Sequence, residues 1–524
     1  MTYISFSFLL FFTITAFIYF LVPSKLQYIV LLISSYLFYF WANGGLPIYM
    51  VITTVIIFVG TNIMSKIDSK TKALISEDKS ITKEKKKELK AKAKSRKKGL
   101  LVLIICVNLL LLSVFKYTQP LLNVFGAELK LNLIFPLGIS FYTFQSLGYV
   151  IDVFRGKVQA EKNFLKTALF VSYFPQIVEG PIGRFNTLAP QLFSEHRFSF
   201  ERFQRGFLLT LWGFLKKVVL ADSLFLLTGT LSTDFNSYDG FQIFVGIMLY
   251  GIQLYADFSG CMDIAMGFSN ILGIQLDYNF RQPYFSTSVA EFWRRWHISL
   301  CQWFKDYLFY SIFMSKPSMN LSKSLRAKGK KTLATKIPTC VAMAIVWFLT
   351  GLWHTANIPY ILWGISNGVI MMFSLLFAEK YKKINSICHI NDNSKVWRFI
   401  RIIRTYLLMT VLNFMSEFKS MSSFGECLLS VIKNPVPHGF SPSYFIPALM
   451  EKGIYAVAII VVVCLAQLFY SLYEENHGSG SLIKAICSKH WIVRSAVAIA
   501  VSMIIILMAQ NSADFSGGFM YAQF

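Results

Sequence analysis

Charged residues are scarce in this chain. Of its 524 residues only 15% are charged, whereas 55% are hydrophobic, and the mean hydropathy is +0.52. This balance excludes an ordinary soluble globular protein and indicates a polytopic membrane protein.

The sequence also lacks the motifs of several common kinds of site. The eight cysteines form no CxxC pair and no His–Cys spacing that suits zinc, so we predict no metal site. There is no Gly-rich phosphate loop. No internal repeat suggests the inverted halves of a secondary transporter.

Basic residues are abundant by comparison. The chain has 51 Lys and Arg against 27 Asp and Glu, a net charge of +24. They cluster in short segments between apolar runs, which argues against nucleic-acid binding and marks cytoplasmic loops under the positive-inside rule. Lys66–Lys98 holds fourteen Lys and Arg against five acids, and Lys316–Lys336 holds seven and no acid. We expect the first to be a solvated charged helix that touches anionic headgroups.

Apolar segments near the roughly 20-residue length of a membrane span recur along the chain. The first has no basic n-region and no cleavage site, so we expect a retained span rather than a signal peptide. Because three spans precede the first basic segment, the N-terminus is expected outside the cytoplasm. The predicted spans are about Tyr3–Leu21, Leu26–Ala42, Leu46–Met64, Gly99–Phe115, Gly206–Leu220, Phe241–Tyr255, Thr339–Trp353, Pro359–Leu376, Phe399–Asn413, Ile454–Ser471 and Ile492–Met508.

Two other apolar runs, Leu133–Ile151 and Phe164–Ile182, contain prolines and glycines. Backbone groups freed at membrane depth must be satisfied by neighbouring protein or by a water-filled cavity. We therefore expect short, tilted or re-entrant helices that line an internal space.

Several charged residues lie among apolar ones. Opposite charges can neutralise one another in a low-dielectric site, so a structural ion-pair network is favoured over catalysis for each carboxylate. These residues are Asp257, Asp263, Asp277, Glu291, Arg294 and Arg295.

Two of the seven histidines are candidates for chemistry. His354 ends an apolar run, and His297 lies in an aromatic stretch, where titratable groups are costly and indicate function. Neutral imidazole can take a proton from an attacking hydroxyl, as acyl transfer to an alcohol requires. The others fall in polar or loop-like stretches and are expected to be ordinary surface residues: His196, His389, His438, His477 and His490.

Five segments in order resemble the membrane-bound O-acyltransferase (MBOAT) family, within it the bacterial branch of alginate O-acetylation and teichoic-acid D-alanylation membrane proteins. The resemblance covers most of the chain from about Phe135 to Gly364. The segments are FPLGISFYTFQSLGYVIDVFRG (Phe135–Gly156), YFPQIVEGPIGRF (Tyr173–Phe185), QLYADFSGCMDIAMG (Gln253–Gly267), FRQPYFSTSVAEFWRRWHISLCQWFKDYLF (Phe280–Phe309) and GLWHTANIPYILWG (Gly351–Gly364).

The resemblance implies an all-α fold, a ring of tilted transmembrane and re-entrant helices around a central funnel. It implies that His354, of the LWH motif, is catalytic and that His297, of the WHISL motif, is an accessory site residue. Asp306, Trp296 and Asn357 are predicted to bind substrate, with a purely structural role as the alternative for Asp306.

Three positions depart from the family pattern. Thr355 stands where glycine commonly follows the motif histidine, and Asn367 stands where a second histidine often occurs. YSIFMSKP replaces the usual Pro-Leu-Gly-Gly turn after WFKDYLF.

On this basis the chain divides into three parts. Residues 1–130 form N-terminal transmembrane helices with a basic cytoplasmic loop at 65–98, residues 131–378 the MBOAT catalytic core, and residues 379–524 C-terminal transmembrane helices.

The implied activity is transfer of an acyl group, acetyl above all, from a cytoplasmic thioester donor across the membrane for O-acetylation of an extracellular or cell-wall polysaccharide. Acetyl-CoA is the expected donor, and no permanently bound cofactor is expected. The resemblance further implies an extracytoplasmic SGNH-hydrolase-like partner, and a bacterial plasma-membrane location. His354 would act as general base while His297 orients or stabilises the developing oxyanion.

Other functions stay open. D-alanyl transfer to teichoic acid and peptidoglycan O-acetylation belong to the same chemistry, and Cys301 is a conceivable covalent acyl carrier. From a different class, intramembrane His, Asp and Arg would also suit a transporter or flippase of a lipid-linked sugar. A purely structural subunit leaves the two histidines unexplained.

Overall fold

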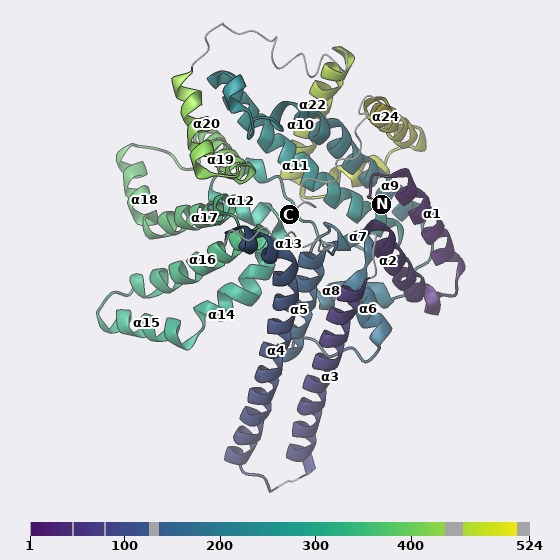
Figure 1. Cartoon of the computed structure of the whole chain (residues 1–524), viewed down its shortest axis with the longest axis vertical. Helices are drawn as coiled ribbons and strands as arrows, with labels where there is room; N and C mark the ends of the chain where they lie inside the picture. The colour runs from purple at the N-terminus through teal and green to yellow at the C-terminus, as the bar shows by residue number, and fades with distance from the viewer. Residues whose placement is uncertain (1, 44–46, 78–79, 125–135, 435–453, 511–524) are drawn as a thin grey trace. The chain divides into compact units, whose positions relative to one another are not determined.

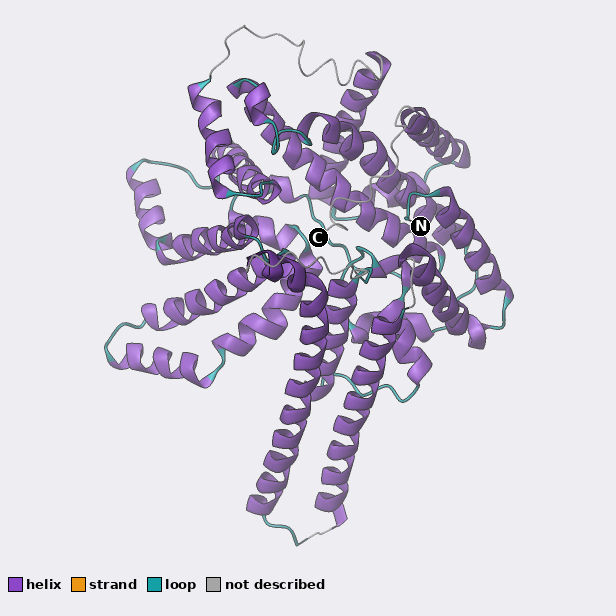
Figure 2. Cartoon of the chain, viewed as in Figure 1, coloured by secondary structure: helices purple, strands orange, loops and turns teal. Residues whose placement is uncertain are grey.

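The chain forms helices throughout the part that its structure, a computed structural model, describes. Residues 2–43, 47–77, 80–124, 136–434 and 454–510 are described, and within them there is no strand (Figure 2). This confirms the predicted all-α fold. The helices group into unit 1, Met1–Phe207 with Ala265–Asp277, and unit 2, Leu208–Ile264 with Tyr278–Phe524.

Nine helices in the described ranges are long and apolar enough to cross a membrane, as a polytopic membrane protein requires. They are α2 (Gln27–Asn43), α3 (Ile48–Glu77), α4 (Lys83–Val124), α11 (Gly240–Ile271), α16 (Leu333–His354), α17 (Ile358–Leu376), α19 (Lys395–Phe414), α22 (Ile454–His477) and α24 (Trp491–Gln510).

Two predicted spans are not among the nine. The first falls on α1 (Phe6–Leu21), an apolar helix of 16 residues. The predicted span Gly206–Leu220 covers the end of α9 (Phe200–Phe214) and most of η2 (Leu215–Ala221), a π-helix. The helix changes type there and continues into α10 (Asp222–Thr228), with two lysines, Lys216 and Lys217, within the predicted span.

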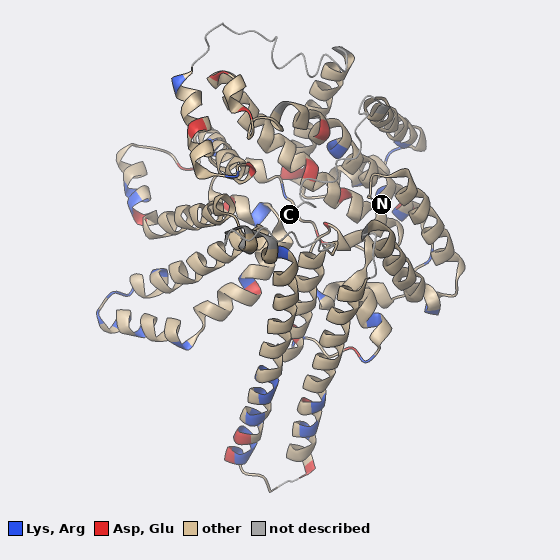
Figure 3. Cartoon of the chain, in the orientation of Figure 1, with Lys and Arg blue, Asp and Glu red and all other residues tan. Residues whose placement is uncertain are grey.

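The long helices α3 and α4 of unit 1 lie side by side as a hairpin, and the Lys- and Arg-rich ends lie beside their connection (Figures 1 and 3). The basic segment Lys66–Lys98 is thus mostly a helical continuation of two spans, because Lys, Glu and Ala are strong helix formers. Lys97 Nζ lies 2.7 Å from Asp68 Oδ2 and ties the two helices together.

Short helices replace regular spans where proline and glycine interrupt unit 1, as predicted. They are α5 (Ile139–Arg155), α6 (Phe164–Ser172), α7 (Phe174–Ile177) and α8 (Phe185–Phe193). The first residues of the predicted run, 133–135, lie outside the described residues.

The polar backbone freed by these breaks is satisfied by side chains. Gln145 Oε1 accepts hydrogen bonds from Gln176 Nε2 at 2.6 Å and from the Gly183 amide at 3.1 Å. The expected internal space is small here: the cavity lined by α5, α6 and α7 measures about 10 Å³.

Unit 2 has its main core at an aromatic cluster on α11, α12 (Val289–Arg295), α17 and α19. Trp293 packs against Trp347 and Trp363, with ring centroids 4.8 and 5.6 Å apart. The remaining helices of this unit are α10 (Asp222–Thr228), α13 (Ile298–Trp303), the π-helix η5 (Phe304–Phe309), α14 (Tyr310–Phe313), α15 (Lys316–Ala327), α18 (Ala378–Ile387), α20 (Met421–Lys433) and α23 (Ser481–Cys487).

Candidate functional site

His354 is the last residue of α16, and two glycines bring the following helix close to it. A Cβ on Gly364 of α17 would lie 2.4 Å from the Trp347 carbonyl oxygen, and one on Gly351 would lie 2.5 Å from the Tyr360 oxygen. Side chains at these positions would force the helices apart, so the glycines permit the close crossing of α16 and α17.

Aromatic rings enclose the His354 side chain, which is only 4% exposed. The Trp363 ring meets the imidazole edge-on at 5.2 Å, and the Tyr360 ring stacks on it at 5.6 Å. The carboxyl end of a helix carries partial negative charge, which stabilises the positive charge that a base acquires when it takes a proton. His354 is therefore placed suitably for a general base.

His297 lies between α12 and α13 in the left-handed backbone conformation, with φ 45° and ψ 52°. For a residue other than glycine this conformation costs of order 1–3 kcal/mol and persists only where the surrounding structure enforces it. Here the Ile298 amide donates to the Asn279 carbonyl oxygen at 3.0 Å, and the Arg281 amide donates to the Arg295 carbonyl oxygen at 2.9 Å. These bonds hold the strained turn in place.

The His297 imidazole is buried against Phe258 of α11, whose ring it meets edge-on at 4.9 Å. The Asn279 amide nitrogen lies 3.1 Å from His297 Nδ1. Burial lowers the pKa of His297, which lies outside the nine candidate spans, to about 3. The ring is therefore neutral at physiological pH.

Both histidines line one cavity of about 330 Å³ within unit 2. Its wall is mainly apolar and aromatic, with Arg294 and Lys305 as its cations. A concave apolar site with a few polar groups is the usual form of a small-molecule site. The structure thus brings together the two histidines that the sequence singled out, from segments 57 positions apart.

The other three predicted site residues are not among those that line this cavity. Trp296 is buried and stacks on Phe292, with ring centroids 5.4 Å apart. Asn357 caps α17, and its side-chain oxygen accepts from the Tyr360 amide at 2.9 Å. Asp306 is half-buried on η5. Their roles in substrate binding stay predictions.

Comparison with known proteins agrees with the motifs. Residues 158–416 match the family model described as MBOAT, membrane-bound O-acyltransferase family. The chain is 31% identical to the Probable alginate O-acetylase AlgI of Pseudomonas syringae pv. tomato, over 79% of this chain and 73% of the relative.

The chain belongs to the membrane-bound O-acyltransferase family. It is 27% identical to the Peptidoglycan O-acetyltransferase of Helicobacter pylori, over 72% of this chain and 76% of that protein. It is 30% identical to the Teichoic acid D-alanyltransferase of Streptococcus thermophilus, over 51% of this chain and 62% of that protein. The protein is therefore an O-acyltransferase and a multi-pass membrane protein.

The buried carboxylates of the acyltransferase are paired with lysines that sequence reasoning missed. Lys217 Nζ lies 2.7 Å from Asp257 Oδ1 and 2.8 Å from Asp222 Oδ1, and Lys216 Nζ lies 2.7 Å from Asp263 Oδ2. Both lysines lie on the π-helix η2. The predicted ion pairing is confirmed for Asp257 and Asp263.

The other charged residues that were expected to form ion pairs have different surroundings. Glu291 pairs with Arg295 at 2.8 Å, as expected, and Arg295 also reaches Glu475 of α22 at 2.6 Å. Asp277 is exposed, so it is no member of the buried network. Arg294 lines the histidine cavity.

Among the described residues, none of the other histidines lines this cavity of the acyltransferase. His389, His477 and His490 are exposed, as predicted, and His438 lies outside the described residues. His196 is half-buried in unit 1, where its Nδ1 lies 3.0 Å from the Tyr19 hydroxyl. The expectation of an ordinary surface residue is wrong for His196, because Tyr19 holds its ring.

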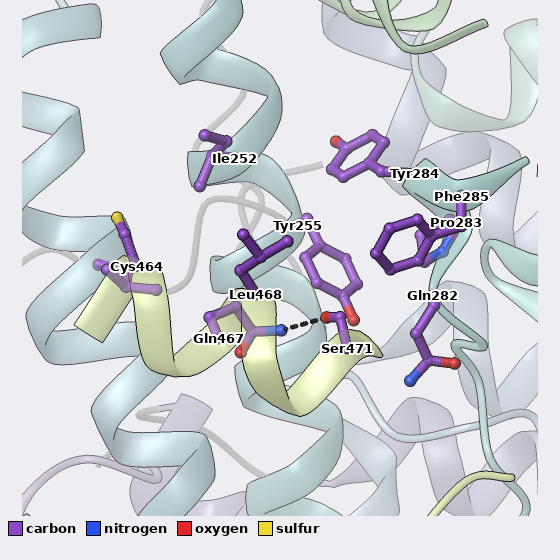
Figure 4. Close-up of a pocket in the computed structure, with 11 residues that line it drawn as sticks. Ile252, Tyr255, Gln282, Pro283, Tyr284, Phe285, Cys464, Gln467, Leu468 and Ser471 are labelled. Carbon is purple, nitrogen blue, oxygen red and sulfur yellow. Dashed lines mark hydrogen bonds between the residues drawn. The ribbon is translucent and has the colours of Figure 1, made fainter. Parts of the chain in front are cut away.

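A second cavity of unit 2, of about 200 Å³, has a different lining (Figure 4). Tyr255 and Tyr284 form one side, and Leu468 and Ser471 of α22 another. The cavity has no histidine, and Gln467 Nε2 donates to Ser471 Oγ at 3.1 Å. Its wall offers no base for acyl transfer. Among the described residues, no group of three or more His, Cys, Asp or Glu is placed to hold a metal ion.

Proposed function

We propose that this O-acyltransferase moves an acetyl group from a cytoplasmic thioester donor, acetyl-CoA, across the plasma membrane to hydroxyls of an extracytoplasmic polysaccharide. The observation that carries the proposal is the shared cavity of about 330 Å³ lined by His297 and His354. The names of the alginate and peptidoglycan relatives support acetyl as the group and a polysaccharide as the acceptor.

On this proposal His354 acts as general base. It takes the proton from the attacking hydroxyl, which belongs to the acceptor or to a relay partner. The hydroxyl oxygen then bonds to the acyl carbonyl carbon of the thioester. His297 donates a hydrogen bond to the oxygen that gains negative charge, and collapse of this intermediate releases the thiolate, which the proton from His354 neutralises. Arg294 and Lys305 line the same cavity and supply positive charge for an anionic donor.

An extracytoplasmic partner of the SGNH-hydrolase type would carry the acetyl group to the sugar, and the N-terminus would lie on the partner's side of the membrane. A covalent acyl-cysteine finds little support. Burial raises the pKa of the Cys301 thiol to about 12, so the thiol is not ionised near neutral pH.

D-alanyl transfer is the second candidate, because a teichoic acid D-alanyltransferase is among the relatives. Its match covers 51% of this chain, whereas the alginate O-acetylase match covers 79%. This difference favours the acetyl reaction.

The test is acyl transfer in membranes that contain the full chain and its partner. Labelled acetyl-CoA should label the polymer or the partner with the wild type but not with His354→Ala at equal expression. His490→Ala, at an exposed histidine, is the matched control and should label normally. Equal labelling by His354→Ala would refute the role of His354. Labelling only from a D-alanyl carrier would refute the acetyl proposal.

A further inference from the structure

The hydrogen bonds around Asn279 determine which nitrogen of His297 carries the proton. Asn279 is buried, being 1% exposed, in the segment that precedes α12. Its side chain contacts three groups: the Ser299 amide, His297 Nδ1 and Met262 Sδ.

The orientation of the Asn279 amide follows from the first contact. The Ser299 backbone N–H lies 2.8 Å from the side-chain oxygen of Asn279. A backbone amide can only donate, so the atom facing it must be the carboxamide oxygen and not the nitrogen.

The carboxamide nitrogen is then the atom that faces His297. It lies 3.1 Å from His297 Nδ1 and 3.3 Å from Met262 Sδ, so its two hydrogens have one acceptor each. An NH₂ group has no lone pair to offer, and Nδ1 must therefore be the acceptor. A neutral imidazole that accepts at Nδ1 carries its proton on Nε2.

We propose that Asn279 is a positioning residue that fixes His297 as the Nε2–H tautomer, so that His297 serves the acyl transfer as a hydrogen-bond donor and not as a base. The inference rests on the proposed function for its catalytic meaning, but the tautomer itself does not depend on it. It also assigns the two histidines different tasks, since only His354 is left to accept the hydroxyl proton.

The backbone of Asn279 adds to the same effect. Its carbonyl oxygen accepts from the Ile298 amide at 3.0 Å, so main chain and side chain of one residue hold both amides that follow His297. The left-handed turn and the orientation of the imidazole are thereby fixed together. A side chain that replaced Asn279 would need both an acceptor for Ser299 and a donor for His297.

The tautomer is measured by nitrogen-15 NMR on the full chain, labelled in histidine and reconstituted in lipid nanodiscs. The signals of His297 are identified as those lost in His297→Ala. At neutral pH the wild type should show a pyridine-like Nδ1 and a protonated, pyrrole-like Nε2. The opposite pattern, or a doubly protonated ring, overturns the proposal in the wild type alone, whatever the variants do.

Asn279→Asp is the matched variant, because the carboxylate has nearly the same shape but can only accept. It should still accept from the Ser299 amide, while His297 Nδ1 becomes protonated. Asn413→Asp is the control, since Asn413 is another buried asparagine of unit 2 whose oxygen accepts from Trp363 Nε1 at 3.0 Å. It should leave the His297 signals unchanged; an unchanged His297 in Asn279→Asp would overturn the proposal.

Acetyl transfer is then measured with the same proteins. Asn279→Asp should lower the rate at least about 100-fold, as expected when a donor to a developing oxyanion is lost. Full activity together with the changed tautomer would overturn the assignment of His297 as donor. If the wild type shows the expected tautomer but no acyl transfer from any donor, the proposed function fails while the role of Asn279 in setting the tautomer stands.

Discussion

Unit 2 holds two sets of buried polar side chains, and they are built in opposite ways. In the first, Lys216 and Lys217 meet carboxylates at 2.7 to 2.8 Å, so every charge has an opposite charge beside it. In the second, His297 and His354 line a cavity and contact aromatic rings directly, and His297 also contacts a carboxamide. Charges that satisfy one another hold helices together, whereas histidines that line a cavity can form hydrogen bonds with a ligand or accept its proton. Buried polar side chains therefore have two different roles in this unit.

The largest effect that distinguishes the two sets is expected at His354. Replacing it with alanine should reduce acyl transfer by about 10³- to 10⁴-fold, because the hydroxyl nucleophile loses its base. The unfolding temperature should change little, since His354 has a cavity on one side. Labelled acyl transfer and thermal unfolding of the same preparation measure both. A large loss of stability would place His354 with the structural set instead.

Lys217→Met should show the reverse behaviour. It leaves Asp257, whose side chain is 1% exposed, without its cation, and removal of one partner from a buried pair costs about 3–5 kcal/mol. The expected result is a large fall in unfolding temperature or in folded yield, with transfer per folded molecule much less affected. The double variant Lys217→Met with Asp257→Leu should recover stability, and Lys419→Met at an exposed lysine should cost little. A stable but inactive Lys217→Met would contradict the division into two sets.

Substitution by glutamine should distinguish the roles of the two histidines. His297→Ala should lose about 10²- to 10³-fold in rate, the usual cost of one oxyanion donor. His297→Gln keeps an N–H and should recover part of that loss, whereas His354→Gln has no basic nitrogen and should recover nothing. The test is the rate of acyl transfer, at saturating donor, of the alanine and glutamine variants at both positions. Equal rescue at both positions would show that the histidines do not differ in role.

The smallest effect is expected at Glu475, which pairs with Arg295 and with Arg398 at 3.2 Å. Because these pairs are partly exposed, Glu475→Gln should cost no more than about 1 kcal/mol and lower the unfolding temperature by a few degrees at most. Acyl transfer should stay within about threefold. Glu426→Gln, at an exposed glutamate on α20, is the control for a lost surface charge.

Much of this arrangement was predictable from local sequence. The lengths of the apolar segments predicted the spans, and the prolines and glycines within two of them predicted the short helices of unit 1. Two histidines in aromatic stretches indicated one site. The lysine partners of Asp257 and Asp263 could not be predicted, because Lys216 and Lys217 lie inside an apolar run about forty to fifty positions away. Their place on a π-helix has no sequence pattern of its own.

Asn279 was missed for a different reason. Its importance depends on the left-handed backbone of His297, eighteen positions later, which brings the Ser299 amide and the imidazole to the same side chain. The two residues do not lie on one helix or strand, so no sequence period relates them. Asn367, noted as a departure from the family pattern, likewise gains meaning only from its bonds: it accepts from Trp293 Nε1 and donates to the Trp363 carbonyl oxygen, both at 2.9 Å.

The α3–α4 hairpin also carries a long charged helical segment. From Lys83 to Lys98 the charged part of α4 is about 24 Å long at the usual helical rise, while the Debye length at physiological salt is only about 8 Å. The charged segment is thus about three Debye lengths long. At physiological salt, charges at the two ends of this segment are therefore screened from each other, and the lysines near Lys83 interact with dissolved ions independently of those near Lys98.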